Sequence, residues 1–259
     1  MPHRPIVIVT GASRGIGAAV ARRLGESGAG VTLLARSEPR LEAAADAVRA
    51  AGGLAETVVG DVSDPEVCRE TVERTLDRFG RIDGLVNNAG VIEPLSVTGV
   101  ADLSRWRYNL EVNVYGPFAL MRYASEALRK RHGRVVNVSS GAASRPIPAA
   151  GAYCAAKAAL THLTRVFAEE EPAVTALCVR PGVVDTAMQA VLRRQGPEHM
   201  PPEDAAFYQQ LHEEGRLEPP EVPGRAIAWL VLHAPKEWSG SFLDYDDPMI
   251  AAPAAQPSW

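Results

Sequence analysis

The feature that most constrains the fold is an alternation, along the whole chain, between short aliphatic runs and longer segments with helical spacing. The short runs are rich in β-branched residues, which is typical of strands covered on both faces. The longer segments have apolar residues three or four positions apart, as crossover helices between parallel strands do. The pattern predicts an α/β protein with a doubly wound parallel sheet.

Seven runs are the expected strands, at residues 5–10, 30–35, 55–60, 84–89, 133–140, 174–181 and 240–245. Helices are expected near residues 15–26, 38–51, 65–79, 102–131, 152–170, 186–194 and 221–233. No repeat or linker divides the chain, so residues 1–259 are expected to form a single domain. A polar, proline-containing stretch at 187–220 is the expected substrate lid, and 246–259 is the expected C-terminal tail.

Composition excludes several kinds of partner. With 46% hydrophobic residues, 22% charged residues and a formal net charge of -4, the chain has no bias towards nucleic acid or anionic membranes. Cys68, Cys154 and Cys178 are far apart, and neither they nor the six His residues form a metal-binding motif. The chain starts with a strand instead of a signal peptide and has no apolar run of ~18 residues. We therefore expect a cytoplasmic protein with free thiols and no metal.

The sequence VTGASRGIG (9–17) joins the first expected strand to the first expected helix. Gly11, Gly15 and Gly17 in this turn would let the backbone approach a ligand closely. Because the free N–H groups and the dipole at a helix N-terminus attract anions, a pyrophosphate fits this place. The turn favours dinucleotide binding over a purely structural tight turn.

The end of the second expected strand indicates which nicotinamide cofactor is preferred. An acidic residue there would hydrogen-bond the ribose 2′-hydroxyl of NAD(H). This chain instead has Ala35 followed by Arg36, whose guanidinium suits a 2′-phosphate, and Arg14 in the glycine turn adds a second positive charge. Although both arginines could also be solvated surface charges, the pattern favours NADP(H).

Tyr153 and Lys157 lie four residues apart in the Ala-rich segment AYCAAKAALTHL (152–163). On a helix such a pair shares one face, which also suits an aromatic ring packed beneath a solvated lysine. A nearby cation stabilises a phenolate and lowers the pKa of a tyrosine, as acid–base catalysis near neutral pH requires. The spacing therefore marks a candidate proton donor and its partner.

Further motifs make the sequence similar to the short-chain dehydrogenase/reductase family over residues 5–190 and the last strand. They are TGASRGIG (10–17), DV (61–62), NNAG (87–90), Asn113 in EVNVYGPF, Ser140 in VNVSSGAA, Tyr153 and Lys157 in YCAAK, and RPGVVDT (180–186). The resemblance implies a Rossmann fold with strand order 3-2-1-4-5-6-7. SSGAA, PGVVDTAMQ and SGSFLDYDD most resemble the NADP-preferring sepiapterin-reductase-like and benzil-reductase-like branch.

The resemblance also implies roles for four catalytic residues. Tyr153 is the proton donor and Ser140 positions the substrate carbonyl. Lys157 tunes Tyr153 and holds the nicotinamide ribose, while Asn113 supports a water relay to Lys157. Ser140 is preferred over Ser139 because it lies thirteen residues before Tyr153, the usual interval in this family.

The implied cofactor contacts follow the same motifs. They are Gly11, Ser13, Arg14, Gly15, Ile16 and Gly17 in the turn, Arg36, then Asp61 and Val62 at the adenine and Asn88, Ala89 and Gly90 on the adenosine side. At the nicotinamide end they are Tyr153, Lys157, Pro181, Gly182, Val183, Val184 and Thr186. Individual members have simpler alternatives: Asn87 could only join strands, and Pro181-Gly182 could only end one.

The sequence indicates the residues of the substrate pocket less clearly than those of the catalytic and cofactor sites. Its expected residues are Val91, Ile92, Glu93, Gly141, Ile147, Met188, Phe207, Tyr208 and Asp244. The spacing of Phe207, Tyr208 and Leu211 equally predicts an amphipathic helix packed on the body of the protein. Asp244 stands where a pterin-reducing relative would have a carboxylate, or it caps the last strand.

These expectations indicate an NADPH-dependent carbonyl reductase that acts on a ketone or a benzil-type α-diketone. The alternatives are a pterin reductase, an alcohol dehydrogenase in the oxidative direction, and a non-catalytic NADP-binding regulatory protein. The last is disfavoured because all four implied catalytic residues are present. By resemblance we expect a homodimer, or else a tetramer, formed through the helices at 102–131 and 152–170.

Overall fold

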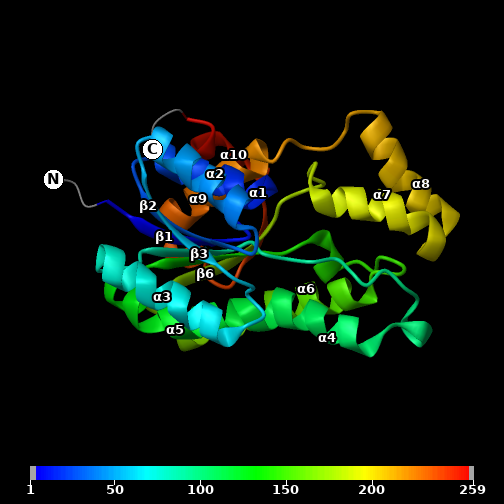
Figure 1. Cartoon of the computed structure of the whole chain (residues 1–259), viewed down its shortest axis with the longest axis horizontal. Helices are drawn as coiled ribbons and strands as arrows, with labels where there is room; N and C mark the ends of the chain where they lie inside the picture. The colour runs from blue at the N-terminus through cyan, green and yellow to red at the C-terminus, as the bar shows by residue number, and fades with distance from the viewer. Residues whose placement is uncertain (1–3, 257–259) are drawn as a thin grey trace.

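The computed structural model describes residues 4–256 and contains one seven-stranded parallel sheet (Figure 1). Its strands are β1 (Ile6–Thr10), β2 (Gly30–Ala35), β3 (Leu54–Val59), β4 (Gly84–Asn87), β5 (Arg134–Val138), β6 (Thr175–Arg180) and β7 (Phe242–Asp244). They are hydrogen-bonded in the order β3-β2-β1-β4-β5-β6-β7. The predicted parallel Rossmann topology is confirmed.

Helices lie on both sides of the sheet (Figure 1). One side has α1 (Gly15–Glu26), α2 (Glu38–Ala50), α9 (Glu221–His233) and α10 (Pro248–Ala254). The other has α3 (Pro65–Phe79), α4 (Leu103–Leu110), α5 (Gly116–Arg131) and α6 (Gly151–Glu170). Two further helices, α7 (Ala187–His199) and α8 (Pro202–Glu213), lie beyond one end of the sheet.

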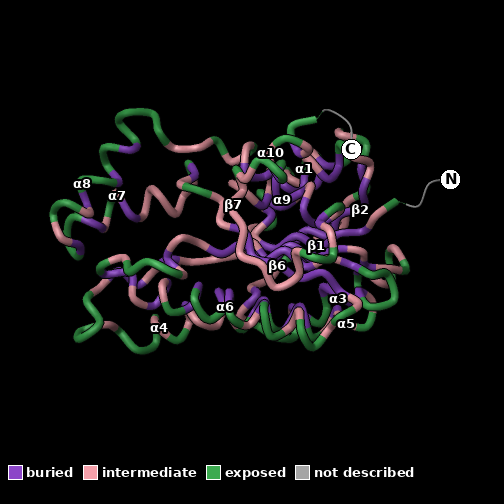
Figure 2. Tube along the Cα trace, turned by 180° about the vertical axis from the view of Figure 1, so that it is seen from behind, coloured by how far each residue is buried: buried purple, intermediate pink, exposed green. Residues whose placement is uncertain are grey.

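Burial of the strands on both faces explains their continuous apolar sequences. Every residue of β1, β2 and β4 is buried, and Figure 2 shows the buried residues concentrated in the sheet. Val7 joins an apolar cluster with Leu24 of α1 and Ile227 of α9, whereas its neighbour Ile8 joins a second cluster with Leu120 of α5. Because successive strand residues point to opposite faces, each strand contributes to both cores.

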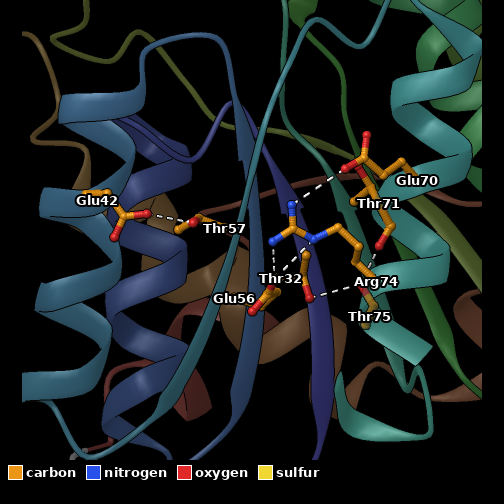
Figure 3. A network of polar contacts seen from close by, with 8 residues as sticks. All are labelled: Thr32, Glu42, Glu56, Thr57, Glu70, Thr71, Arg74 and Thr75. Atoms are coloured by element: carbon orange, nitrogen blue, oxygen red, sulfur yellow. Dashed lines mark hydrogen bonds and ion pairs between the residues drawn. The ribbon is translucent and has the colours of Figure 1, made fainter. Parts of the chain in front are cut away.

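The edge strand β3 uses polar side chains to attach itself to both helix layers. Glu56 pairs with Arg74 of α3, whereas the next residue, Thr57, donates a hydrogen bond of 2.6 Å to Glu42 of α2 (Figure 3). The alternation is again that of a pleated strand. Charged side chains at an exposed edge also oppose pairing with a strand of another molecule.

The helix expected at residues 102–131 is present from Leu103 to Arg131, but it contains a π-helical turn that the sequence did not predict. α4 ends at Leu110, residues Glu111–Tyr115 form a π-helical turn, and α5 follows. In this turn the Gly116 N–H donates to the Glu111 carbonyl, five residues earlier. Pro117 explains the change, because proline has no N–H and its ring clashes with the carbonyl four residues earlier, here that of Asn113.

Residues 187–220 hold two helices, and the first, α7, is longer than the helix expected at 186–194. Gly196 and Pro197 would be expected to end α7, yet α7 continues to His199 and packs against α8. Gly196 is buried, and a Cβ built on it would lie 3.5 Å from the Met200 sulfur and 3.8 Å from the Ala205 Cβ. Packing against α8 thus outweighs the low helix propensity of the Gly-Pro pair. The helix predicted from the spacing of Phe207, Tyr208 and Leu211 is present as α8.

The predicted C-terminal tail contains a short helix, α10. Asp247 caps it by accepting a hydrogen bond of 2.9 Å from the Met249 N–H. Ile250 and Ala254 are buried, and the helix packs on α9. Residues 257–259 of the predicted tail lie outside the described residues.

The sequence also led to predictions about the cysteines and about membrane-spanning segments. Cys68, Cys154 and Cys178 are free thiols, as predicted. None of the helices within residues 4–256 combines the length and the apolar character that crossing a membrane requires.

Candidate active site

A cleft with a volume of about 930 Å³ runs along the carboxyl ends of the strands. In open parallel sheets, ligands bind at this edge where the strand order reverses, which is here between β1 and β4. The cleft brings together the glycine turn, the segments after β4, β5 and β6, and the start of α6. Of the predicted catalytic and cofactor residues, all but Gly17 and Asn113 line it.

The glycine turn leaves the backbone open to the cleft. Gly11 and Gly15 have φ angles of +64° and +55°, in the left-handed region that favours glycine. A Cβ on Gly17 would lie 2.4 Å from the Gly11 carbonyl oxygen, so Gly17 is required by packing within the turn. Arg14 is the N-cap of α1 and makes no capping hydrogen bond with its side chain. The first N–H groups of α1 are therefore available to a pyrophosphate, which fits this cradle.

Arg36 follows β2 and belongs to a polar cluster with Asp61 and Tyr108. Its Nη1 donates to the Tyr108 hydroxyl at 2.9 Å and lies 3.5 Å from the Asp61 carboxylate. The Tyr108 hydroxyl in turn donates to Asp61 at 2.7 Å. Burial raises the pKa of Asp61, but hydrogen bonds from Ser63 and Tyr108 and the charge of Arg36 outweigh it, so the pKa is lowered. Asp61 is thus an anion that holds Arg36 and Tyr108 together.

Ser140, Tyr153 and Lys157 meet in the same part of the cleft. Ser140 follows β5, while Tyr153 and Lys157 share one face of α6 and are only 7% and 4% exposed. The Lys157 Nζ lies 5.6 Å from the centre of the Tyr153 ring, and the Ser140 side chain hydrogen-bonds that of Tyr153. The hydroxyl of Ser139 instead contacts that of Thr161 at 2.8 Å in the interior. Ser140 is accordingly the serine beside the phenol.

Burial shifts the pKa values of Tyr153 and Lys157 in opposite directions. It raises the pKa of Tyr153 to about 12, although the hydrogen bond with Ser140 acts to lower it. It lowers the pKa of Lys157 to about 8. The net lowering of the tyrosine pKa that the sequence predicted is not found, because desolvation of the phenol outweighs the effect of a nearby ammonium, which here also donates to the Val138 carbonyl at 2.8 Å.

Asn113 lies in the π-helical turn behind the cleft. Its Nδ2 donates to the carbonyl oxygens of Val91 at 2.8 Å and Asn109 at 3.0 Å, and its Oδ1 accepts from the Val91 N–H at 3.3 Å. A Cβ on Gly90 would lie 2.8 Å from the Asn113 Oδ1 and 3.7 Å from the Lys157 Nζ. Asn113 therefore fixes the segment after β4 and adjoins Lys157 across Gly90.

The segment after β6 closes the other end of the cleft. Gly182 has a φ angle of +77°, and a Cβ on it would lie 2.8 Å from the Tyr245 ring. Glu218 holds the following residues through its backbone, donating to the Val183 carbonyl at 2.9 Å and accepting from the Asp185 N–H at 2.8 Å. The chain returning from α8 thus braces the segment that we expected at the nicotinamide.

Most of the predicted substrate residues line the cleft, namely Val91, Ile92, Gly141, Ile147, Met188, Phe207 and Tyr208. Glu93 and Asp244 do not. Glu93 accepts a hydrogen bond of 3.0 Å from Gln195 of α7. Both carboxylate oxygens of Asp244 accept from the Arg180 guanidinium, and Asp244 does not line the cleft. The placement of these two residues in the pocket is not supported, because each carboxylate has a partner elsewhere.

Several lining residues were not predicted: Ser37, Arg40, Tyr108, Arg145, Arg180, Pro220, Tyr245 and Asp246. Tyr108 reaches the cleft from α4, and none of the sequence motifs included it. Arg145 did carry a signal. It is a charged residue in the short loop between Ser140 and Tyr153, the two residues that the motifs placed at the reaction centre.

Comparison with known proteins assigns the family. The model of the short chain dehydrogenase family matches residues 5–196. The chain belongs to the short-chain dehydrogenase/reductase family. The resemblance predicted from the motifs is confirmed, and it accounts for the glycine turn and the Tyr-x-x-x-Lys spacing together.

Two relatives cover nearly the whole chain. An uncharacterized oxidoreductase of Schizosaccharomyces pombe is 34% identical over 241 residues, which are 93% of this chain and 96% of that protein. A benzil reductase of Saccharomyces cerevisiae that forms (S)-benzoin is 33% identical over 254 residues, with 93% and 96% covered. Within the short-chain dehydrogenase/reductase family, the chain lies in the benzil-reductase-like branch.

Solved structures agree with the fold and with a nicotinamide cofactor. A short-chain dehydrogenase/reductase from Saccharomyces cerevisiae is 35% identical with a TM-score of 0.90 and covers 96% of this chain and 98% of its own. An NAD⁺-bound xylitol dehydrogenase is 27% identical (TM-score 0.84, 93% and 96% covered). An alcohol dehydrogenase from Thermococcus sibiricus, complexed with 5-hydroxy-NADP, is 28% identical (TM-score 0.79, 95% and 99% covered). The protein is thus an oxidoreductase of a family that uses NAD or NADP on CH–OH and C=O groups.

Proposed function

We propose that the protein is an NADPH-dependent carbonyl reductase that reduces ketones or α-diketones. The observation that carries the proposal is the meeting of Ser140, Tyr153 and Lys157 beside a cleft whose other end is the glycine turn. The similarity to a benzil reductase supports an α-diketone as the substrate. A pterin reductase has less support, since Asp244 pairs with Arg180 and does not line the cleft. No observation separately favours alcohol oxidation, which would use the same three side chains.

Tyr153, Ser140 and Lys157 each have a separate role in the proposed reduction. NADPH supplies a hydride when it is bound. Tyr153, whose pKa of about 12 keeps it protonated at neutral pH, donates its proton to the carbonyl oxygen as that oxygen gains negative charge. Ser140 hydrogen-bonds the same oxygen, and Lys157, charged below about pH 8, stabilises the phenolate left on Tyr153.

We propose that the cofactor is NADP(H) rather than NAD(H). Arg14, Arg36 and Arg40 all line the cleft near the end of β2, where Ala35 takes the place of an acidic residue. Guanidinium groups bind phosphate in a bidentate manner, so this cluster suits a ribose 2′-phosphate. Asp61, the nearest carboxylate, is held by Tyr108 and Arg36.

We further propose that the whole chain is one catalytic unit in which residues 187–220 act as a substrate lid. Met188, Phe207 and Tyr208 support this role, because they reach the cleft from α7 and α8. We also propose that the protein is a cytoplasmic homodimer. Three dispersed free thiols suit a reducing compartment.

Tyr153→Phe tests the proposed mechanism. It should lower kcat for the reduction of benzil by ~10²–10⁴-fold, the usual loss for a missing general acid. NADPH affinity, measured from the change in nucleotide fluorescence on binding, should stay near that of the wild type. Unchanged carbonyl reduction by the variant would exclude Tyr153 as the proton donor.

A substrate and cofactor panel tests the rest of the proposal. NADPH oxidation should be followed with benzil, a simple aryl ketone, a pterin and a steroid, and each reaction repeated with NADH. We expect reduction of the diketone or ketone, with NADPH clearly preferred. Equal or faster turnover with NADH would contradict the cofactor assignment, and a preference for the pterin would contradict the substrate class.

A further inference from the structure

A cation that the proposed chemistry does not use stands on the substrate side of the cleft. Arg145 lines the cleft and lies in the loop that leads from Ser140 to α6. A Cβ built on Gly141 would be 3.4 Å from the Arg145 Nη2 and 3.9 Å from its Nε. The guanidinium therefore packs against the backbone of the residue that directly follows Ser140.

A second arginine, Arg180, also lies beside Gly141, but its charge is paired with a carboxylate. The Arg180 Cδ lies 3.6 Å from the same position on Gly141, and the Arg180 guanidinium is held by both carboxylate oxygens of Asp244. Across residues 4–256, by contrast, no carboxylate forms an ion pair with Arg145. Of the two positive charges beside Gly141, only that of Arg145 is left without compensation from an acidic side chain.

Tyr208 is a second polar residue that lines the cleft together with Arg145. Its ring is buried at the wall of the cleft, and burial raises its pKa. The carboxylate of Asp204, one turn earlier in α8, acts in the same direction, whereas the charge of Arg145 opposes both. Tyr208 also interacts electrostatically with Tyr153. Tyr208 and Tyr153 belong to the same buried cluster, and both line the cleft with Arg145, so the Tyr208 hydroxyl is part of the wall that the cation and the proton-donating phenol share.

We propose that Arg145 and Tyr208 form an anion subsite and that the preferred substrates are keto acids, in which a carboxylate is attached to the reacting carbonyl. This inference rests on the proposed carbonyl reductase function. The carbonyl lies at Ser140 and Tyr153, and the adjoining carboxylate accepts hydrogen bonds from Arg145 and Tyr208. Hydride adds to the carbonyl carbon, the Tyr153 proton goes to its oxygen, and the product is a hydroxy acid with its carboxylate unchanged.

A neutral diketone satisfies this subsite less well. The second oxygen of a diketone accepts one hydrogen bond from the guanidinium but does not neutralise its charge. A carboxylate does both, and the planar fork of arginine matches its two oxygens. The subsite therefore selects an anionic neighbour of the carbonyl over a neutral one.

A matched acid and ester test the proposal. Benzoylformate and methyl benzoylformate share the reacting ketone and the phenyl ring and differ in the charge of the carboxyl group. Arg145→Met should lower kcat/KM for benzoylformate about 10- to 100-fold, as expected for losing a hydrogen bond to a charged group, and should change kcat/KM for the ester less than about 3-fold. Arg145→Lys should keep part of the activity on the acid. Arg78→Met, at an exposed arginine of α3 outside the cleft and outside the proposed lid, is the control and should change neither.

A binding measurement separates this inference from the proposed function. With NADP⁺ present, titration calorimetry should show that Arg145→Met weakens binding of mandelate at least about 10-fold and that Tyr208→Phe weakens it by a smaller factor. Binding of methyl mandelate should be unaffected. Equal losses for acid and ester, or a wild type that prefers the ester, would overturn the keto-acid proposal. If no carbonyl compound is reduced with NADPH, the proposed function fails, whereas mandelate binding still decides the subsite.

Discussion

At the scale of single residues, burial of Tyr153 and Lys157 shifts their pKa values and so determines how the proposed activity depends on pH. Tyr153, with a pKa of about 12, stays protonated throughout the working range, whereas Lys157, with a pKa of about 8, loses its charge within it. Because the lysine pKa is lowered from 10.5, the ammonium exists below about pH 8 and disappears above it. We predict that kcat/KM for ketone reduction is level below pH 7 and falls through an apparent pKa near 8.

The control for this pH profile is Lys157→Met. The variant should reduce the ketone far more slowly, and its residual kcat/KM should lack the decrease near pH 8. If the decrease persists in the variant at the same pH, another group causes it and the assignment to Lys157 is wrong.

A second prediction at the residue scale concerns Tyr108. Its hydroxyl accepts a hydrogen bond from Arg36 and donates one to Asp61, so it orients the guanidinium that we assign to the 2′-phosphate. Tyr108→Phe should raise the KM for NADPH about 3- to 10-fold, the loss expected for one neutral hydrogen bond, and leave the KM for NADH unchanged. Initial rates with both cofactors measure this. An equal effect on both KM values would show that Tyr108 acts on the fold and not on the phosphate.

At the scale of elements, motifs predicted the site better than helical spacing predicted the helices around it. Apolar spacing ran unbroken from 102 to 131, but Pro117 forces the π-helical turn that separates α4 from α5. Conversely, Gly196 and Pro197 suggested an end to α7 that packing against α8 overrides. At Gly196 a contact with the neighbouring helix decides the outcome, and a local pattern does not contain it, whereas Pro117 was a local signal that the apolar spacing alone did not reveal.

The proposed lid yields a prediction about α8. Phe207 lines the cleft yet is 49% exposed, so it can contact a bound substrate without supporting the fold. Phe207→Ala should raise the KM for benzil several-fold, in line with the apolar area lost, and should leave the melting temperature within about 2 °C. Met249→Ala, a similarly exposed residue on α10, should change neither value. A fall in melting temperature with an unchanged KM would make α8 a structural element and not a lid.

At the scale of the whole molecule, the sheet was predictable and the distribution of charge in the cleft was not. The alternation of buried strands with crossover helices predicted a parallel sheet, and the family resemblance implied its strand order. The Ser140, Tyr153 and Lys157 group was predictable because its motifs are local. The pairing of Arg180 with Asp244 joins residues 64 positions apart, so the sequence did not show that Asp244 is engaged while Arg145 is not.

The last prediction concerns assembly, which we propose occurs through α5 and α6. These helices lie on the same side of the sheet and carry the exposed apolar residues Phe118 and Val166, and the exposed Tyr115 directly precedes α5. Phe118→Lys places a charge on this surface and should weaken a dimer at least about 10-fold, because truncating an aromatic interface residue commonly costs that much. Light scattering after size exclusion at micromolar concentration should then show a monomer, whereas Met249→Lys, on the opposite side of the sheet, should remain dimeric. A dimer of unchanged stability in Phe118→Lys would place the interface on another surface of the protein.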